Sequence, residues 1–259
     1  MEAPAPTVVL PLIGRWDFLL SRIGRPWRTI SYPLVMHSAE DRVWYASYGS
    51  NCDLSRFMLY LEGGRRAGTN GGHLGARNPS PPLDSAPLEF STQVAFTGVS
   101  KRWGGGVAFL EHRRRSDTPG ALGRRYLITR EQFDDVVAQE SRRPTTVVDV
   151  DGLDPGELRV IGSGSYDALL ALQPVDGIPV ITFTSPNPPE NRESAAPSVD
   201  YLTTIATGLR QVHHVSTKLI VERLRLVPII ASNWSRRELL DAVVGVDGGS
   251  PRPNGPNDS

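Results

Sequence analysis

The sequence predicts an α+β fold, with a small closed or strongly curved β-barrel and flanking helices. Short apolar runs separated by turn residues recur between residues 43 and 184, a spacing typical of many short strands in a curved sheet. Runs with apolar residues at i, i+3 and i+4 interrupt these strands and return after residue 198, which indicates helices. With 259 residues, 39% of them hydrophobic, the chain can bury a sizeable core in one domain or in two small ones.

The first elements surround a short loop. A strand is expected over residues 43–48 and a helix over residues 53–62, with Gly63 and Gly64 as the helix end. Ser50 and Asp53 fit a capping box at the helix start. Residues 64–87 are rich in Gly, Pro, Asn and Arg, so a long irregular loop is expected there. The apolar face of this first helix is expected to be formed by Leu54, Phe57, Met58 and Leu61.

Further strands and helices follow along the chain. The expected strands cover residues 88–96, 106–110, 125–128, 146–150, 158–161 and 178–184. One helix between them begins at a capping box formed by Thr129 and Gln132. Late helices are expected over residues 198–214, 217–226 and 235–244, the last with a capping box of Ser235 and Glu238.

The expected organisation has three parts. Residues 1–40 form an extension that packs on the domain or on a partner, residues 41–245 form the domain, and residues 246–259 form a disordered tail. The extension is open to two roles, as part of a homodimer interface or as a cover over a pocket.

The composition narrows the class of partner. Lys and Arg number 28 and Asp and Glu also number 28, so no electrostatic feature favours nucleic acid or a membrane as partner. The single cysteine, Cys52, excludes an internal disulfide and a thiolate metal cage, and a small apolar packing role is expected for it. No run of about 18 apolar residues and no secretory signal is found, which predicts a cytoplasmic protein.

The loop Tyr48-Gly49-Ser50-Asn51 joins the first strand to the first helix. A strand end that leads into a helix start gathers unpaired backbone N–H groups and the positive end of the helix dipole, which together suit a carboxylate or an oxyanion. Gly49 lacks the Cβ that would hinder a close approach to this backbone. The same four residues also fit an ordinary strand–cap–helix connection.

A carboxylate on an apolar helix face is the second candidate feature. In the helix after Thr129, the residues Phe133, Val136 and Val137 mark the apolar face, and Glu140 falls on the same stripe. Alone among the acidic residues of this helix, Glu140 is expected to point inward. A carboxylate held against apolar surface is penalised for being ionised and so holds a proton more readily, as a general acid/base must. The alternative is a fraying last turn in which Glu140 pairs with Arg142 or Arg143.

Four ordered segments resemble the gamma-glutamylcyclotransferase family. Residues 45–51 (YASYGSN) resemble the strand-and-loop signature of that family, although Cys52 follows where Leu or Met is usual. Residues 103–108 (WGGGVA) are similar to a W-x-GG-x-A strand, and Gln139-Glu140 ends a helix as the family's catalytic Glu does. Residues 194–201 (SAAPSVDY) look like the stretch that supplies a substrate-contacting Tyr. The resemblance covers about residues 43–215 and is nearest to an actinobacterial branch whose members mostly lack assigned substrates.

The resemblance implies an enzyme that acts on a small γ-glutamyl compound without a metal or cofactor. The α-amino group of the substrate attacks its own γ-carbonyl and releases 5-oxoproline and a free amine or peptide. Glu140 would be the general acid/base. The substrate would be bound by Tyr45, Tyr48, Gly49, Ser50, Asn51 and Tyr201.

Each expected binding residue also has a structural interpretation. Tyr45 and Tyr48 would fit the core as aromatic residues of an alternating strand, Asn51 would fit a helix cap, and Tyr201 would fit the apolar face of a late helix. The five histidines show no HExxH spacing, so a zinc enzyme is poorly supported. Two other functions stay open: a non-catalytic small-molecule binding or regulatory module, and an enzyme that transfers or cleaves an acyl amide.

Overall fold

The computed structural model describes residues 41–65, 72–115, 117–145 and 147–245. The expected extension over residues 1–40 and the expected tail over residues 246–259 lie outside the described residues. Within the described part of the chain, no helix is long and apolar enough to cross a membrane.

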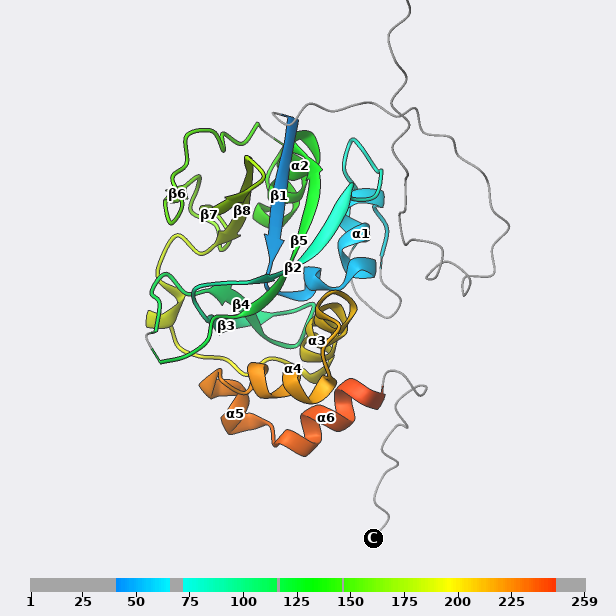
Figure 1. Ribbon diagram of the computed structural model, residues 1–259, viewed down its shortest axis with the longest axis vertical. Coiled ribbons are helices and arrows are strands. Elements are labelled where there is room, and N and C mark those ends of the chain that lie inside the picture. The colour runs from blue at the N-terminus through cyan, green and yellow to red at the C-terminus, as the bar shows by residue number, and fades with distance from the viewer. Residues whose placement is uncertain (1–40, 66–71, 116, 146, 246–259) are drawn as a thin grey trace, which may run out of the picture. The chain divides into compact units, whose positions relative to one another are not determined.

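The main sheet contains six strands in the order β2-β5-β1-β8-β7-β6 (Figure 1). Its central strand β1 (Arg42–Ser47) pairs antiparallel with β5 and parallel with β8. A separate two-stranded sheet is formed by β3 and β4. The remaining strands of the molecule are β2 (Asp84–Glu89), β3 (Val94–Ser100), β4 (Gly105–Leu110), β5 (Leu122–Thr129), β6 (Leu158–Val160), β7 (Ala168–Val175) and β8 (Ile178–Thr184).

The α+β class is confirmed, but the predicted barrel is wrong. Strands β2 and β6 are the two ends of the six-stranded sheet and are not hydrogen-bonded to each other, so the sheet stays open. Strands β3 and β4 pair with each other in a separate sheet. The spacing of strands along the sequence does not predict whether the sheet closes, because closure depends on which strands meet in space.

Six helices are described, with α3 next to α4 and α6 (Figure 1). Helix α2 begins directly after β5, whereas a short turn separates β1 from α1. Their bounds are α1 (Leu54–Glu62), α2 (Arg130–Ser141), α3 (Val199–His213), α4 (Thr217–Leu224), α5 (Pro228–Asn233) and α6 (Arg236–Gly245).

Strand β1 is buried on both faces because helices cover both sides of the sheet. Side chains alternate along a strand, so Val43 and Tyr45 join a core with residues of α1 and α2, whereas Trp44 and Ala46 join a core with residues of α3. The near-continuous burial of residues 43–48 follows from this double cover. The C-terminal end of β1 therefore lies where both helical layers can contribute residues.

Several predicted elements need correction. The expected strand over residues 88–96 is two strands, because the chain leaves β2 after Glu89 and enters β3 only at Val94. Residues 147–150 of the expected strand 146–150 are buried in part but pair with no strand, since the Val148 N–H donates to the Asp134 carboxylate instead (2.9 Å). Strand β7 and helix α5 were not expected from the sequence.

Candidate active site

The loop after β1 is a 3-10 turn over Ser50–Cys52 that precedes α1. It is closed by hydrogen bonds from Cys52 N–H to Gly49 O (3.0 Å) and from Asp53 N–H to Ser50 O (3.1 Å). The predicted capping box of Ser50 and Asp53 is wrong. Asp53 itself caps α1 by accepting from Arg56 N–H at 2.8 Å, so the helix begins one turn later than a cap at Ser50 would allow.

The turn is fixed from two other elements. The Tyr126 hydroxyl in β5 donates to Asn51 O at 2.8 Å. Helix α3 packs on the backbone of the turn at Gly208, where an added Cβ would lie 2.1 Å from the Cys52 carbonyl carbon. Cys52 is fully buried, and burial raises the pKa of its thiol to about 12, so the side chain packs as a small neutral residue, as expected.

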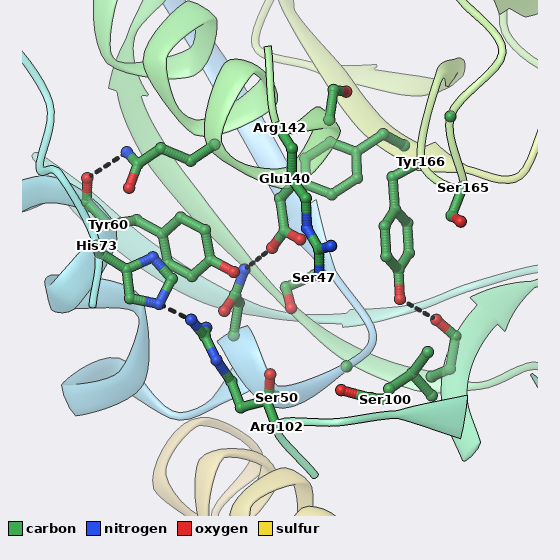
Figure 2. Close-up of a pocket in the computed structure, with 18 of the residues that line it drawn as sticks. Ser47, Ser50, Tyr60, His73, Ser100, Arg102, Glu140, Arg142, Ser165 and Tyr166 are labelled. Carbon is green, nitrogen blue, oxygen red and sulfur yellow. Dashed lines mark hydrogen bonds between the residues drawn. The ribbon is translucent and has the colours of Figure 1, made fainter. Parts of the chain in front are cut away.

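Helix α2 delivers Glu140 to this turn. The predicted capping box of Thr129 and Gln132 is confirmed in both directions and fixes the start of the helix. Glu140 lies in the last turn and is half-buried. The Asn51 side-chain nitrogen donates to Glu140 Oε1 at 3.1 Å and to the Tyr45 hydroxyl at 3.1 Å. Two motifs that are 89 residues apart in sequence are thus joined by one amide (Figure 2).

The expectation that Glu140 is the single acidic residue of α2 directed inward is wrong. Asp134 and Asp135 are 7% and 3% exposed. Asp135 accepts from the Arg77 backbone N–H at 2.8 Å and pairs with the Arg77 guanidinium at 3.0 Å, and Asp134 accepts from Val148 N–H. Segments that are distant in sequence cover the outer side of α2, which a helical periodicity cannot reveal. The alternative in which Glu140 forms an ion pair with Arg142 or Arg143 is not found among the described residues.

Tyrosine hydroxyls surround the Glu140 carboxylate. Burial raises the pKa of Tyr45 well above its usual value, and the charge of Glu140 raises it further. The pKa of Tyr60 in α1 is raised by the same two causes in the same order. Both phenols therefore stay protonated and can donate hydrogen bonds beside a carboxylate. The Tyr48 hydroxyl donates to Phe183 O at 2.7 Å, which fixes that ring at the end of β1.

The other two family-like segments lie side by side. Gly106 N–H donates to Ala196 O at 2.8 Å, and a Cβ at Gly106 would lie 2.1 Å from Ala195 O, so this contact requires glycine. The chain then enters α3, whose Tyr201 hydroxyl accepts from Ala108 N–H at 3.3 Å. A Cβ at Gly49 would lie 3.0 Å from this hydroxyl. The absence of a side chain at Gly49 thus lets Tyr201 reach the turn.

All seven residues predicted for the site line one pocket with a volume of about 1240 Å³. They are Tyr45, Tyr48, Gly49, Ser50, Asn51, Glu140 and Tyr201. In the part of the chain that is described, no group of three or more His, Cys, Asp or Glu side chains could hold a metal ion.

The sequence did not single out several other pocket residues. Arg56, Tyr60, His73, Arg102 and Tyr166 also line the pocket. The expected apolar face of α1 contained Leu54 and Met58, but these two are only partly buried. The buried residues of α1 are Arg56, Phe57, Tyr60 and Leu61. Arg56 and Tyr60 are polar residues at i and i+4 in the helix directly after the candidate loop, and this spacing could have identified them as pocket residues. His73 comes from the long loop, for which no single residue could be chosen.

No family model matches the chain. A stretch of 103 residues is 39% identical to histone deacetylase 5 from Arabidopsis thaliana, and the match spans 38% of this chain but only 15% of the length of that protein.

Two solved structures are similar at low sequence identity. One is a gamma-glutamyl cyclotransferase, 15% identical, with a TM-score of 0.46 over 79% of this chain and 99% of that chain. The other is the uncharacterized human protein loc79017, 19% identical, with a TM-score of 0.42 over 66% of this chain and 80% of that chain. Both similarities concern the mixed α+β fold.

Proposed function

We propose that this protein is a γ-glutamyl cyclotransferase that converts a γ-glutamyl amine or peptide into 5-oxoproline and the free amine or peptide. One observation carries the proposal: the Glu140 carboxylate accepts a hydrogen bond from Asn51 of the strand–helix turn, inside a pocket walled by tyrosines. The residues on which the sequence resembles the gamma-glutamylcyclotransferase family, in the turn, at Glu140 and at Tyr201, line that same pocket.

The reaction needs little beyond conformation and proton transfer. The α-ammonium group of the substrate gives a proton to Glu140, and the free amine then attacks the γ-carbonyl carbon. A new C–N bond closes the five-membered ring, and the bond from that carbon to the original amide nitrogen breaks. Attack leaves the ring nitrogen with one proton too many, and Glu140 carries this proton as well as the first one to the departing nitrogen, which leaves as an ammonium group. The products therefore contain all atoms of the substrate, and no water is consumed. Because nucleophile and carbonyl belong to one molecule, holding the folded conformation supplies much of the rate.

The turn and the tyrosines have separate roles in this scheme. The backbone N–H groups of Gly49, Ser50 and Asn51 would bind the substrate α-carboxylate or the tetrahedral oxyanion. Loss of one oxyanion donor in other enzymes lowers the rate by roughly 10²–10³-fold. Tyr45 and Tyr60 keep their protons and would donate hydrogen bonds near Glu140. Tyr48 and Tyr201 would wall the pocket on the side of the turn.

Product identity tests this reaction against the two other functions. The purified protein is incubated with a panel of γ-glutamyl amines and dipeptides, and the products are identified by mass spectrometry. Cyclotransfer gives 5-oxoproline together with an equal amount of free amine or amino acid. Glutamate instead of the lactam would show hydrolysis and contradict the proposal. No product from any member, with binding retained, would favour a small-molecule binding module.

A further inference from the structure

Two arginines in the pocket converge on one imidazole nitrogen. Arg56 Nη1 lies 2.5 Å and Arg102 Nη1 lies 2.9 Å from His73 Nε2 (Figure 2 shows the Arg102 contact). A guanidinium can only donate, so His73 Nε2 must accept and the imidazole must be neutral. Burial first, and then the charges of Arg56 and Arg102, lower the pKa of His73 to about 4, in agreement with this state. The cluster therefore carries two positive charges and no negative one.

The two guanidinium groups have no acidic partner in the part of the chain that the structure describes. Arg56 is only 6% exposed, and its further contacts are the Tyr60 hydroxyl at 3.4 Å and the rings of Tyr60 and Trp103. No ion pair joins Arg56 or Arg102 to a described Asp or Glu. The neighbouring residues 66–71, which are outside the described part, contain no acidic residue. Burying a charge without a counter-ion is costly, so an anion is the expected occupant of this cluster.

The cluster is built from three segments and held in place. Arg56 and Tyr60 are one turn apart on α1, and Arg102 follows the end of β3. His73 is fixed by hydrogen bonds in both directions with Gly64, from Gly64 N–H to His73 O at 3.0 Å and from His73 N–H to Gly64 O at 2.7 Å. The His73 ring lies 4.0 Å from the Tyr60 ring, centre to centre. These contacts hold the donors in position before any ligand arrives.

Tyr60 connects the arginine cluster to Glu140. Its hydroxyl accepts from Arg56 Nη2 at 3.4 Å, and its pKa responds to Glu140, to Arg56 and to Arg102. In Figure 2 the Tyr60 ring lies between His73 and Glu140. The turn at Gly49–Asn51 is next to Glu140 itself through the bond from Asn51. The pocket thus offers two separate places for an anion, the turn beside Glu140 and the arginines beyond Tyr60.

We infer that Arg56 and Arg102 bind a carboxylate on the leaving group, so the preferred substrates are γ-glutamyl amino acids or peptides rather than simple γ-glutamyl amines. This inference rests on the proposed function. The α-carboxylate and the α-amine of the glutamyl part are bonded to the same carbon. Because the α-amine must reach Glu140, the α-carboxylate belongs at the turn next to Glu140. A second carboxylate, on the departing amino acid, is then the group that reaches past Tyr60. Two guanidiniums around one carboxylate give charge-assisted hydrogen bonds, which are stronger than neutral ones.

A matched pair of substrates tests the inference. γ-Glutamyl-alanine and γ-glutamyl-ethylamine differ only by the carboxylate of the leaving group. The wild-type protein should use the first with a kcat/KM roughly 10- to 100-fold higher. Arg102→Gln should lower kcat/KM for γ-glutamyl-alanine roughly tenfold and change that for γ-glutamyl-ethylamine by less than about twofold. Arg114→Gln, an exposed position outside the pocket lining, removes the same charge and should leave both values unchanged.

A binding measurement separates this inference from the proposed reaction. In Glu140→Gln protein, calorimetry should show γ-glutamyl-alanine binding roughly tenfold or more tightly than γ-glutamyl-ethylamine, and Glu140→Gln with Arg102→Gln should lose that difference. This result supports the anion site even if no 5-oxoproline is ever formed. Equal affinity for the two compounds, or an equal loss for both on Arg102→Gln, overturns the inference. If the protein forms 5-oxoproline equally well from both compounds, the inference about the arginines is overturned, but the cyclotransferase proposal stays in place.

Discussion

At the scale of single residues, Asn51 links the turn after β1 to Glu140. Its side-chain nitrogen donates to Glu140 and to Tyr45, and its backbone oxygen accepts from Tyr126. Its side-chain oxygen is buried and has no hydrogen-bond partner among the described residues. A buried acceptor beside a carboxylate is suited to the ammonium group of a substrate. Asn51 therefore acts both as part of the turn and as a positioning residue for Glu140.

Asn51→Ala should impair the site and the fold together. The change removes one hydrogen bond from Glu140 and leaves the buried Tyr45 hydroxyl without this donor, which should lower the free energy of unfolding by roughly 1–3 kcal/mol. The rate of 5-oxoproline release should fall by roughly tenfold or more, because Glu140 is less well positioned. Asn187→Ala, at an exposed position, is the matched control and should change neither. Unchanged turnover in Asn51→Ala would show that Glu140 is held by other contacts.

His73 makes the stability of the protein depend on pH. The pKa of His73 is about 4 in the folded protein, against about 6.5 for an unperturbed histidine. Below about pH 6.5 the unfolded chain binds a proton that the folded protein does not, so the free energy of unfolding falls as pH drops from about 6.5 to about 4. Because His73 is only half-buried, solvent screening reduces its contribution to roughly 1–3 kcal/mol, and this contribution is fully present above that range.

Denaturant unfolding of the wild type and of His73→Gln measures this contribution. Gln keeps an acceptor oxygen for the two arginines but does not titrate. The wild type should lose more stability than His73→Gln between about pH 7 and about pH 4.5, because the other titrating groups are common to both proteins. Equal losses in the two proteins would mean that His73 is not held neutral in the folded state.

At the scale of elements, the site depends on how helices contact the turn after β1. Helix α2 is fixed at its start by the Thr129 and Gln132 capping box and carries Glu140 at its other end. Helix α3 brings Tyr201 to the turn and packs through Gly208 on the backbone of Cys52 and Asp53. The turn is therefore held between two helices from distant parts of the sequence.

Gly208→Ala should be destabilising although alanine is the better helix former. Replacing a mid-helix glycine by alanine would by itself stabilise a helix by about 1 kcal/mol. Here the new Cβ would lie 2.1–2.3 Å from backbone atoms of Cys52 and Asp53, so α3 must move away from the turn. We expect a net loss of roughly 1–3 kcal/mol in the free energy of unfolding, with a lower rate of turnover.

Thr207→Ala is the control on the same helix and should be close to neutral, because Thr207 is only partly buried. Thermal unfolding of both variants gives the comparison. A gain in stability for Gly208→Ala would show that α3 does not press on the turn.

At the scale of the whole molecule, the site lies entirely between residues 45 and 201 and is enclosed by elements of residues 41–245. We therefore expect a fragment of residues 41–245 to fold and to keep the activity of the full chain. Circular dichroism, thermal unfolding and the rate of 5-oxoproline release compare the two. A fragment that is unfolded, or folded but at least tenfold slower, would assign a necessary role to the residues that were removed.

The sequence allowed local structure to be predicted better than long-range contacts. The capping boxes of Thr129 with Gln132 and of Ser235 with Glu238 are both present, because each depends on residues three apart. The family-like motifs point to both Glu140 and the turn at residues 48–51, and the structure joins the two through the hydrogen bond from Asn51 to Glu140. The seven residues chosen from the sequence all line one pocket.

Features that depend on contacts between distant segments were missed. Whether β2 and β6 meet decides if the sheet closes, and no local pattern contains that information. The burial of Asp135 depends on Arg77, which lies 58 residues away. Likewise, the cluster of Arg56, His73 and Arg102 joins a helix, a loop and a strand end, each of which appears ordinary when taken alone.

The rate of 5-oxoproline release by Glu140→Gln is the most direct test of the central claim, that Glu140 transfers the protons of a cyclisation. Gln keeps the size of the side chain and an oxygen that can accept from Asn51, so the variant should unfold at nearly the temperature of the wild type. With an active γ-glutamyl substrate, we expect kcat to fall by roughly 10²–10⁴-fold. A folded Glu140→Gln variant that releases 5-oxoproline at the wild-type rate would contradict the account.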